Sequence, residues 1–174
     1  ATWRLGDRLF GRTAGIVAAG LLAVAPLAVR DAHYVKHDVP VTLLVVLAHL
    51  VAAAGLASAT RASTWLWAGA AAGLAISTHY YAVFVLVPVA AMALWPMGNG
   101  HPSTAVGRLT RVGIGTLVAF AVTSPFLILE PGTAWRDIVG NRQIVMDRAA
   151  ASTGAFGSLG YYVSSLWSEG LGPA

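Results

Sequence analysis

Long apolar runs without a formal charge dominate this chain and restrict what it can fold into. The run 39–59 contains no Asp, Glu, Lys or Arg, and neither does the stretch 62–97. A helix of about 20 apolar residues is long enough to cross a bilayer. Charged residues make up 10% of the chain and hydrophobic residues 57%, whereas an ordinary soluble domain carries about 25% charge. The sequence therefore predicts an integral, multi-pass membrane protein.

The predicted fold class is all-α, a polytopic transmembrane helical bundle. The stretch 62–97 is too long for one ordinary span and holds a polar break near its middle, so we divide it into two short helices, with a single tilted span as the alternative. About five membrane helices are then expected, at 13–30, 39–59, 64–78, 80–96 and 112–129. An interfacial helix over 133–147 and the start of a further span over 161–174 are expected to follow. Residues 1–174 are interpreted as part of one transmembrane domain of a longer protein.

Basic residues between the apolar runs predict the orientation of the chain. Three arginines precede the first run, and Arg61, Arg108 and Arg111 lie in later loops. Loops rich in Lys and Arg stay on the cytoplasmic side, so the segment 30–38 is expected on the opposite side. The net charge of +4 is spread over these loops. It is therefore attributed to topology, and no nucleic-acid partner is expected.

The densest polar cluster lies between the first two expected spans. Its members are Arg30, Asp31, His33, Tyr34, Lys36, His37 and Asp38. Ionisable groups near membrane depth are costly unless paired, which makes them functional candidates. If the first span continues as a helix through the cluster, Arg30, His33 and His37 share one face with Tyr34. Such a face could hold a phosphate, and Asp38 could bind a metal or take a proton. The alternative is a solvated loop in which Asp38 caps the next helix.

Two further polar breaks are candidates of the same kind. His79 lies in the break 77–81, where non-helical backbone is tolerated only if it is buried in protein or lines a wet cavity. Pro125 is expected to kink the last span just before the turn that contains Glu130. His49, alone in an apolar run, is interpreted as a packing hydrogen bond. Neither a phosphate-binding loop of the GxxxxGK type nor a GxSxG or HExxH motif is present.

Four ordered segments together carry a resemblance to a known family. They are Leu5 to Gly15 (LGDRLFGRTAG), Ala25 to Pro40, Ala68 to Tyr80 and Thr123 to Gly132. The chain resembles the GT-C membrane glycosyltransferases, within them the bacterial branch that includes protein O-mannosyltransferases, aminoarabinose transferases of lipid A and Rgt-type sugar transferases. The resemblance implies a polyprenyl-phosphate-linked sugar donor and a lipid, glycan or protein acceptor. It implies transfer to an acceptor hydroxyl at the outward face of a bacterial-type plasma membrane.

The resemblance also implies roles for individual residues. Asp38 would organise the acceptor or a divalent metal, Mg²⁺ or Mn²⁺, and is the expected catalytic residue of this segment. The donor phosphate would be held by Lys36, Arg30 and His79. The acceptor or substrate groove would be lined by His33, Tyr34, His37, Tyr80 and Glu130. The family's general base is expected in a loop upstream of Ala1. Relatives often carry lysine where this chain has His79, and histidine is charged only in part at neutral pH.

Two other function classes remain open on the sequence alone. A secondary transporter or channel could use Asp31, Asp38 and His79 as an intramembrane ion path. A non-catalytic membrane subunit could use its Gly- and Ala-rich helices to pack against a partner. A transporter would generally show inverted repeats, and none is evident. A packing subunit should tolerate alanine in the polar cluster.

Overall fold

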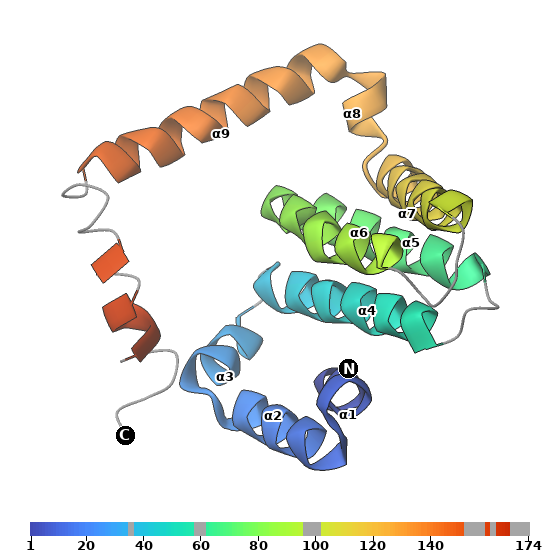
Figure 1. The fold of residues 1–174 in the computed structure, drawn as a ribbon. Helices are drawn as coiled ribbons and strands as arrows, with labels where there is room; N and C mark the ends of the chain where they lie inside the picture. The colour runs from blue at the N-terminus through green and yellow to red at the C-terminus, as the bar shows by residue number, and fades with distance from the viewer. Residues whose placement is uncertain (35–36, 58–61, 96–101, 152–158, 161–162, 168–174) are drawn as a thin grey trace.

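The computed structural model describes residues 1–34, 37–57, 62–95, 102–151, 159–160 and 163–167. Within these ranges all regular elements are helices, which confirms the all-α fold class. Their bounds are α1 Thr2–Phe10, α2 Arg12–Val24, α3 Pro26–Ala32, α4 Asp38–Ala57, α5 Ala62–Thr78, the 3₁₀ helix η1 Tyr80–Val85, α6 Leu86–Leu94, α7 Pro102–Thr123, α8 Phe126–Leu129 and α9 Pro131–Ala151. Figure 1 shows α4, α5, α6 and α7 side by side as a bundle, with α1 to α3 next to α4 and with α8 and α9 beyond α7.

The core of the bundle is built mainly from small side chains. Its buried members are Ala48, Ala52, Trp65, Ala68, Ala72, Val85, Val89, Ala93 and Val112. Trp65 is the one large side chain among them. Its ring lies where a Cβ on Gly55 would approach to 2.9 Å, so a glycine on α4 makes room for the indole from α5. Small residues let helix backbones approach closely, which is the usual way that membrane helices gain packing energy.

The tightest contact is between α5 and α7. A Cβ added to Gly69 would clash with the Val112 carbonyl, and one added to Gly73 would clash with that of Thr116. The Thr116 hydroxyl, itself buried, lies 3.1 Å from the Gly69 carbonyl oxygen and 2.9 Å from that of Val112. Helices α5 and α7 therefore approach at backbone distance and are joined by an interhelical hydrogen bond.

The first expected span is broken. Ala25 is extended, with φ −62° and ψ 121°, because the residue before a proline is disfavoured in the helical region. Pro26 then begins α3, and α2 and α3 meet at an angle of 61°. Before this break, α1 packs against α2 at a Gly6–Gly15 crossing, and the turn between the two helices needs Gly11 at φ +92°.

The predicted number of five membrane helices is too high when the helices found are judged by their length and composition. In the described residues, two helical stretches are long and apolar enough to cross a membrane, Asp38–Leu56 and Thr104–Thr123, and the α2–α3 pair would make a third. The other two expected spans correspond to α5, which has 17 residues, and to the short apolar stretch Tyr80–Leu94. The last span was expected at 112–129, but α7 begins ten residues earlier, at Pro102, and ends at Thr123.

Beyond α7 the chain leaves the bundle. Residues Ser124 and Pro125 separate α7 from the short α8, and α9 then projects away from the bundle (Figure 1). The expected interfacial helix over 133–147 falls within α9. Its Trp135 side chain is 67% exposed. Of the expected span over 161–174, only residues 163–167 are described.

Large apolar side chains cover much of the surface. Phe10, Val122 and Leu117 are each at least 70% exposed, and many others exceed 40%. Contiguous apolar surface of this kind is a liability in water. In a bilayer the same side chains contact lipid tails, as expected for a membrane-integral chain.

Candidate functional site

The polar cluster around residues 30–38 lies at one end of the bundle. Helix α3 ends at Ala32, and α4 begins at Asp38. The helix therefore does not continue through the cluster, and the helical face conditionally expected for Arg30, His33, Tyr34 and His37 does not form. The ring of His33 turns back instead, with Nδ1 2.7 Å from the Val29 carbonyl oxygen.

Asp38 is the first residue of α4. Its main-chain carbonyl accepts a hydrogen bond of 2.7 Å from the Thr42 hydroxyl, and its carboxylate oxygen Oδ1 lies 3.6 Å from Nε2 of His37. The side chains of Asp38 and His37 are 48% and 50% exposed. A carboxylate in the first helical turn is favoured by the helix dipole. That position still leaves the carboxylate accessible to a ligand.

His79 comes to the same end of the bundle from a different segment. It is extended, with φ −155° and ψ 121°, and it separates α5 from η1. Its Nδ1 accepts a hydrogen bond of 3.4 Å from the Tyr81 main-chain N–H. The centroids of the His37 and His79 rings are 4.4 Å apart. The break at His79 therefore lies against the cluster around Asp38, and these two candidate sites form a single site.

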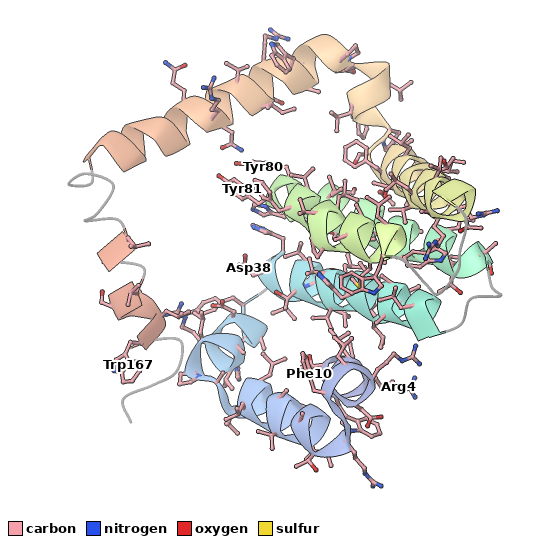
Figure 2. The ribbon with its side chains drawn as sticks, viewed as in Figure 1. Arg4, Phe10, Asp38, Tyr80, Tyr81 and Trp167 are labelled. Atoms are coloured by element: carbon pink, nitrogen blue, oxygen red, sulfur yellow. The ribbon has the colours of Figure 1, made fainter. Side chains whose placement is uncertain are left out.

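Two tyrosines extend this group of rings, as Figure 2 shows beside Asp38. The His79 ring centroid lies 5.2 Å from that of Tyr80 and 5.0 Å from that of Tyr81, in stacked orientations. The Tyr80 and Tyr81 centroids are 4.2 Å apart.

The third candidate region reaches this end of the bundle through one hydrogen bond. The hydroxyls of Ser77 on α5 and Ser124, just after α7, are 2.7 Å apart. Pro125 follows Ser124 and begins the turn into α8. Glu130 lies beyond α8, where its main-chain N–H donates to the Phe126 carbonyl and α8 packs against α9. Ser124 is therefore joined to the site through Ser77, whereas Glu130 lies in the segment that leaves the bundle.

The residues expected to bind the donor phosphate lie in different parts of the structure. Arg30 lies on α3, with Nε 3.4 Å from Oδ1 of Asp31. Lys36 lies outside the described residues. His79 is therefore the expected phosphate-binding group that the structure places next to Asp38, through the ring of His37.

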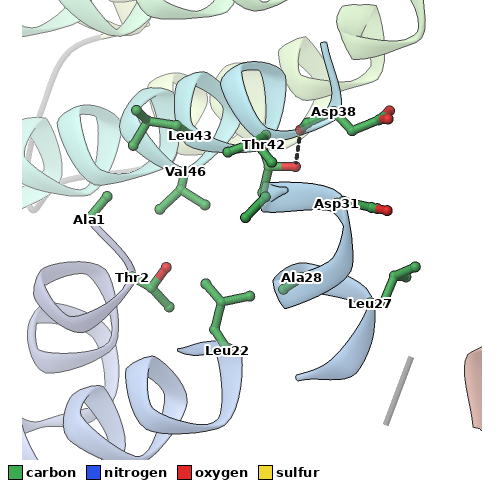
Figure 3. Close-up of a pocket in the computed structure, with 12 residues that line it drawn as sticks. Ala1, Thr2, Leu22, Leu27, Ala28, Asp31, Asp38, Thr42, Leu43 and Val46 are labelled. Atoms are coloured by element: carbon green, nitrogen blue, oxygen red, sulfur yellow. Dashed lines mark hydrogen bonds between the residues drawn. The ribbon is translucent and has the colours of Figure 1, made fainter. Parts of the chain in front are cut away.

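A pocket of about 410 Å³ lies between α4 and the first three helices (Figure 3). Its lining is mainly apolar and includes Leu22, Leu27, Leu43 and Val46. Asp31 and Asp38 are its two carboxylates, and they lie at the same rim in Figure 3. The polar group at the end of the bundle is thus continuous with an apolar pocket.

Side chains at this site could supply only part of the ligand shell of a divalent metal. In the described part of the chain, no three His, Asp or Glu side chains gather as a metal-binding group. Asp38 and His37 offer two ligands at most. No step of the mechanism is therefore assigned to a metal.

Sequence reasoning missed two parts of the site. Tyr81 was included in the polar break but not among the site residues, although the adjacent tyrosine pair was visible as a signal. The apolar pocket, by contrast, depends on the bend at Pro26, which brings Leu27 and Ala28 over α4. No periodicity in the sequence indicates that contact.

His49 was expected to make a packing hydrogen bond, and the contact that the structure gives its ring lies within its own helix. Its Nδ1 lies 2.8 Å from the Val45 carbonyl oxygen within α4, and the residue is half-buried. It lies eleven residues along the helix from Asp38, about 16 Å at 1.5 Å per residue. His49 therefore takes no part in the site.

Comparison with known proteins identifies a family. Neither a curated protein nor a solved structure matches the chain. A family model described as dolichyl-phosphate-mannose-protein mannosyltransferase matches residues 1–129. The match includes α1 to α8 and hence the cluster of Asp38, His37, His79 and the two tyrosines. The chain therefore belongs to the dolichyl-phosphate-mannose-protein mannosyltransferase family of membrane glycosyltransferases.

Proposed function

We propose that the protein to which this chain belongs transfers a sugar from a polyprenyl-phosphate-linked donor to an acceptor hydroxyl on the non-cytoplasmic face of the membrane. The family match over residues 1–129 carries the proposal. The site supports it, because a half-exposed carboxylate, two histidines and two tyrosines from separate segments meet at one end of the bundle.

The reaction requires two kinds of help from the protein. The leaving group is a phosphate, whose departing negative charge needs a cationic partner, and the attacking hydroxyl must be oriented and relieved of its proton. The proposal assigns the first task to Lys36, Arg30 and His79. It assigns orientation of the acceptor hydroxyl to Asp38, whose carboxylate oxygens can accept its hydrogen bond.

The apolar pocket suits a lipid-linked substrate. Its lining offers the contacts that an isoprenoid chain requires, while Asp31 and Asp38 lie at its rim. A donor with its lipid among apolar residues would therefore present its phosphate and sugar near the polar cluster.

The positions of two arginines support the outward face. Arg108 and Arg111 lie on α7 toward the end of the bundle opposite Asp38, and positive residues favour the cytoplasmic side. Asp38 and His79 then belong to the non-cytoplasmic side.

Within the described residues, the groups of the alternative ion path, Asp31, Asp38 and His79, lie at one end of the bundle. Asp31 is paired with Arg30 at 3.4 Å. His49, the remaining titratable group within α4, is about 16 Å from Asp38 along the helix, too far to exchange a proton with it directly. We therefore make no second proposal.

The proposal is tested by sugar transfer from a panel of radiolabelled polyprenyl-phosphate sugars, using membranes that contain the full-length protein. Wild-type protein should transfer at least one sugar, mannose first, and a Lys36→Ala/Asp38→Ala double variant should not. The matched control Asp137→Asn replaces an exposed carboxylate on α9 and should transfer like wild type. Folded wild-type protein that transfers from no donor would contradict the proposal, and an ion-flux assay would then be the next step.

A further inference from the structure

The two tyrosines of the cluster have no part in the proposed binding of the phosphate and the acceptor hydroxyl. Tyr80 and Tyr81 are each 50% exposed, and their ring centroids are 4.2 Å apart at an interplanar angle of 38°. A pair of aromatic rings that is half-exposed beside charged groups offers flat apolar surface next to hydrogen-bonding partners. That combination suits a ligand with both kinds of surface.

A pyranose ring is such a ligand. One of its faces presents C–H groups, and hydroxyls surround its rim. The face of an aromatic ring is electron-rich and attracts groups with partial positive charge, such as polarised C–H bonds. Binding sites for small polar molecules combine apolar and aromatic walls with a few placed polar groups that fix orientation.

We propose that Tyr80 and Tyr81 form a platform on which the pyranose ring of a sugar substrate stacks, with its rim hydroxyls toward His37 and Asp38. The proposal rests on the glycosyltransferase function proposed above. It adds the chemical group that the tyrosines bind and a site residue, Tyr81, that the sequence did not single out.

The contacts of the tyrosines point to this use. The His79 ring stacks on both of them, at 5.2 and 5.0 Å, and contacts the His37 ring at 4.4 Å. His37 in turn lies 3.6 Å from the Asp38 carboxylate. A sugar stacked on the tyrosines would therefore have imidazole and carboxylate groups on one side, where the reacting atoms are proposed to lie.

The competing explanation is that the tyrosines only anchor the chain at the membrane interface, where Trp and Tyr are enriched. Interfacial anchoring accounts for their exposure. It does not require stacking on His79, nor the hydrogen bond from the Tyr81 N–H that holds this imidazole. Trp95, 64% exposed directly after α6 at the other end of the bundle, provides a matched interfacial aromatic outside the site.

The test uses full-length protein in membranes, with polyprenyl-phosphate mannose as donor and sugar-free polyprenyl phosphate as competitive inhibitor. Tyr80→Leu and Tyr81→Leu, measured separately, should each raise about tenfold the KM of the substrate whose sugar they bind. The inhibition constant of the sugar-free lipid should stay unchanged. Tyr80→Phe and Tyr81→Phe keep the ring face and should stay within about twofold of wild type. Trp95→Leu should change neither constant.

The pattern of constants distinguishes the outcomes. A rise in KM for the donor identifies the donor's sugar as the stacked ring, and a rise in KM for a glycan acceptor identifies the acceptor's sugar. Equal weakening of donor and sugar-free lipid would overturn the platform, because the tyrosines would then serve the lipid or the fold. Unchanged constants in both leucine variants would also overturn it while leaving the transferase function intact. Folded wild-type protein without any transfer would contradict the function itself.

Discussion

The two ends of the bundle differ in chemistry although the same helices form both. At one end, the start of α4, the break after α5 and the end of α7 bring together a carboxylate, two histidines, two tyrosines and a serine pair. At the other end, Arg108 lies 5.7 Å from the Trp65 ring centroid, and Trp95 directly follows α6. The first end has the groups that the proposed transfer would use, and the second has residues of the kinds that favour the cytoplasmic side and anchor helices in membranes. Function in this fold is therefore expected to depend on which end is changed.

The largest effect is expected at the carboxylate. Asp38→Asn keeps the size of the side chain but weakens its hold on the acceptor hydroxyl, so the loss of orientation should lower sugar transfer by the full-length protein about 100-fold. Radiolabel transfer from polyprenyl-phosphate mannose measures the loss. Asp137→Asn serves as the control. A rate within threefold of wild type would remove Asp38 from its proposed role.

A change in the middle of the bundle should affect both ends together. Gly69→Ala places a methyl group against the Val112 carbonyl, and overpacking of this kind costs about 1–3 kcal/mol. Thermal unfolding in detergent should therefore move to lower temperature. The control Gly113→Ala lies on α7 beside Val112, and its methyl group would meet no atom within 4 Å. It should leave the unfolding midpoint unchanged or raise it. Equal midpoints in both variants would contradict the close α5–α7 contact.

A moderate effect is expected at His79. His79→Gln can still form hydrogen bonds but carries no positive charge, so transfer should fall about tenfold, as for loss of one charge-assisted hydrogen bond. His79→Lys provides a fixed charge at the same place and should retain more activity than His79→Gln. Initial rates at saturating donor measure both. The opposite order of the two variants would show that His79 acts through its ring rather than its charge.

The smallest effect is expected at the opposite end. Arg108→Gln removes a cation next to the buried Trp65 ring, an interaction worth about 0.5–2 kcal/mol. Transfer should stay within twofold of wild type, with a slightly lower unfolding midpoint. A loss of transfer comparable with that of Asp38→Asn would show that the chemistry is not confined to one end.

Much of this arrangement was predictable from local sequence. Uncharged runs indicated membrane helices, and the polar residues around His79 mark the place where α5 ends and η1 begins. The bend at Pro26 was missed because apolar residues continue through it, although a proline disfavours helix in the residue before it. The early start of α7 was missed because the Pro- and Gly-containing sequence before it reads as a loop.

The candidate site was predictable as parts rather than as a whole. Asp38 and His79 each stood out as polar groups at the edge of apolar runs. Their association depends on α4 and α5 being antiparallel and on the α5–α7 glycine contact, which are properties of tertiary packing. The ring contact between His37 and His79 joins residues 42 positions apart, and no helical or strand periodicity encodes such a pair.

The account depends most on the claim that the Asp38 end of the bundle performs sugar transfer on the non-cytoplasmic face. The most direct test supplies a water-soluble, short-chain polyprenyl-phosphate mannose only to the outside of sealed, right-side-out membrane vesicles that contain the full-length protein. We predict transfer of the label by wild-type protein and no transfer by Asp38→Asn. Transfer that requires the vesicles to be opened, or that Asp38→Asn retains in full, would contradict the account.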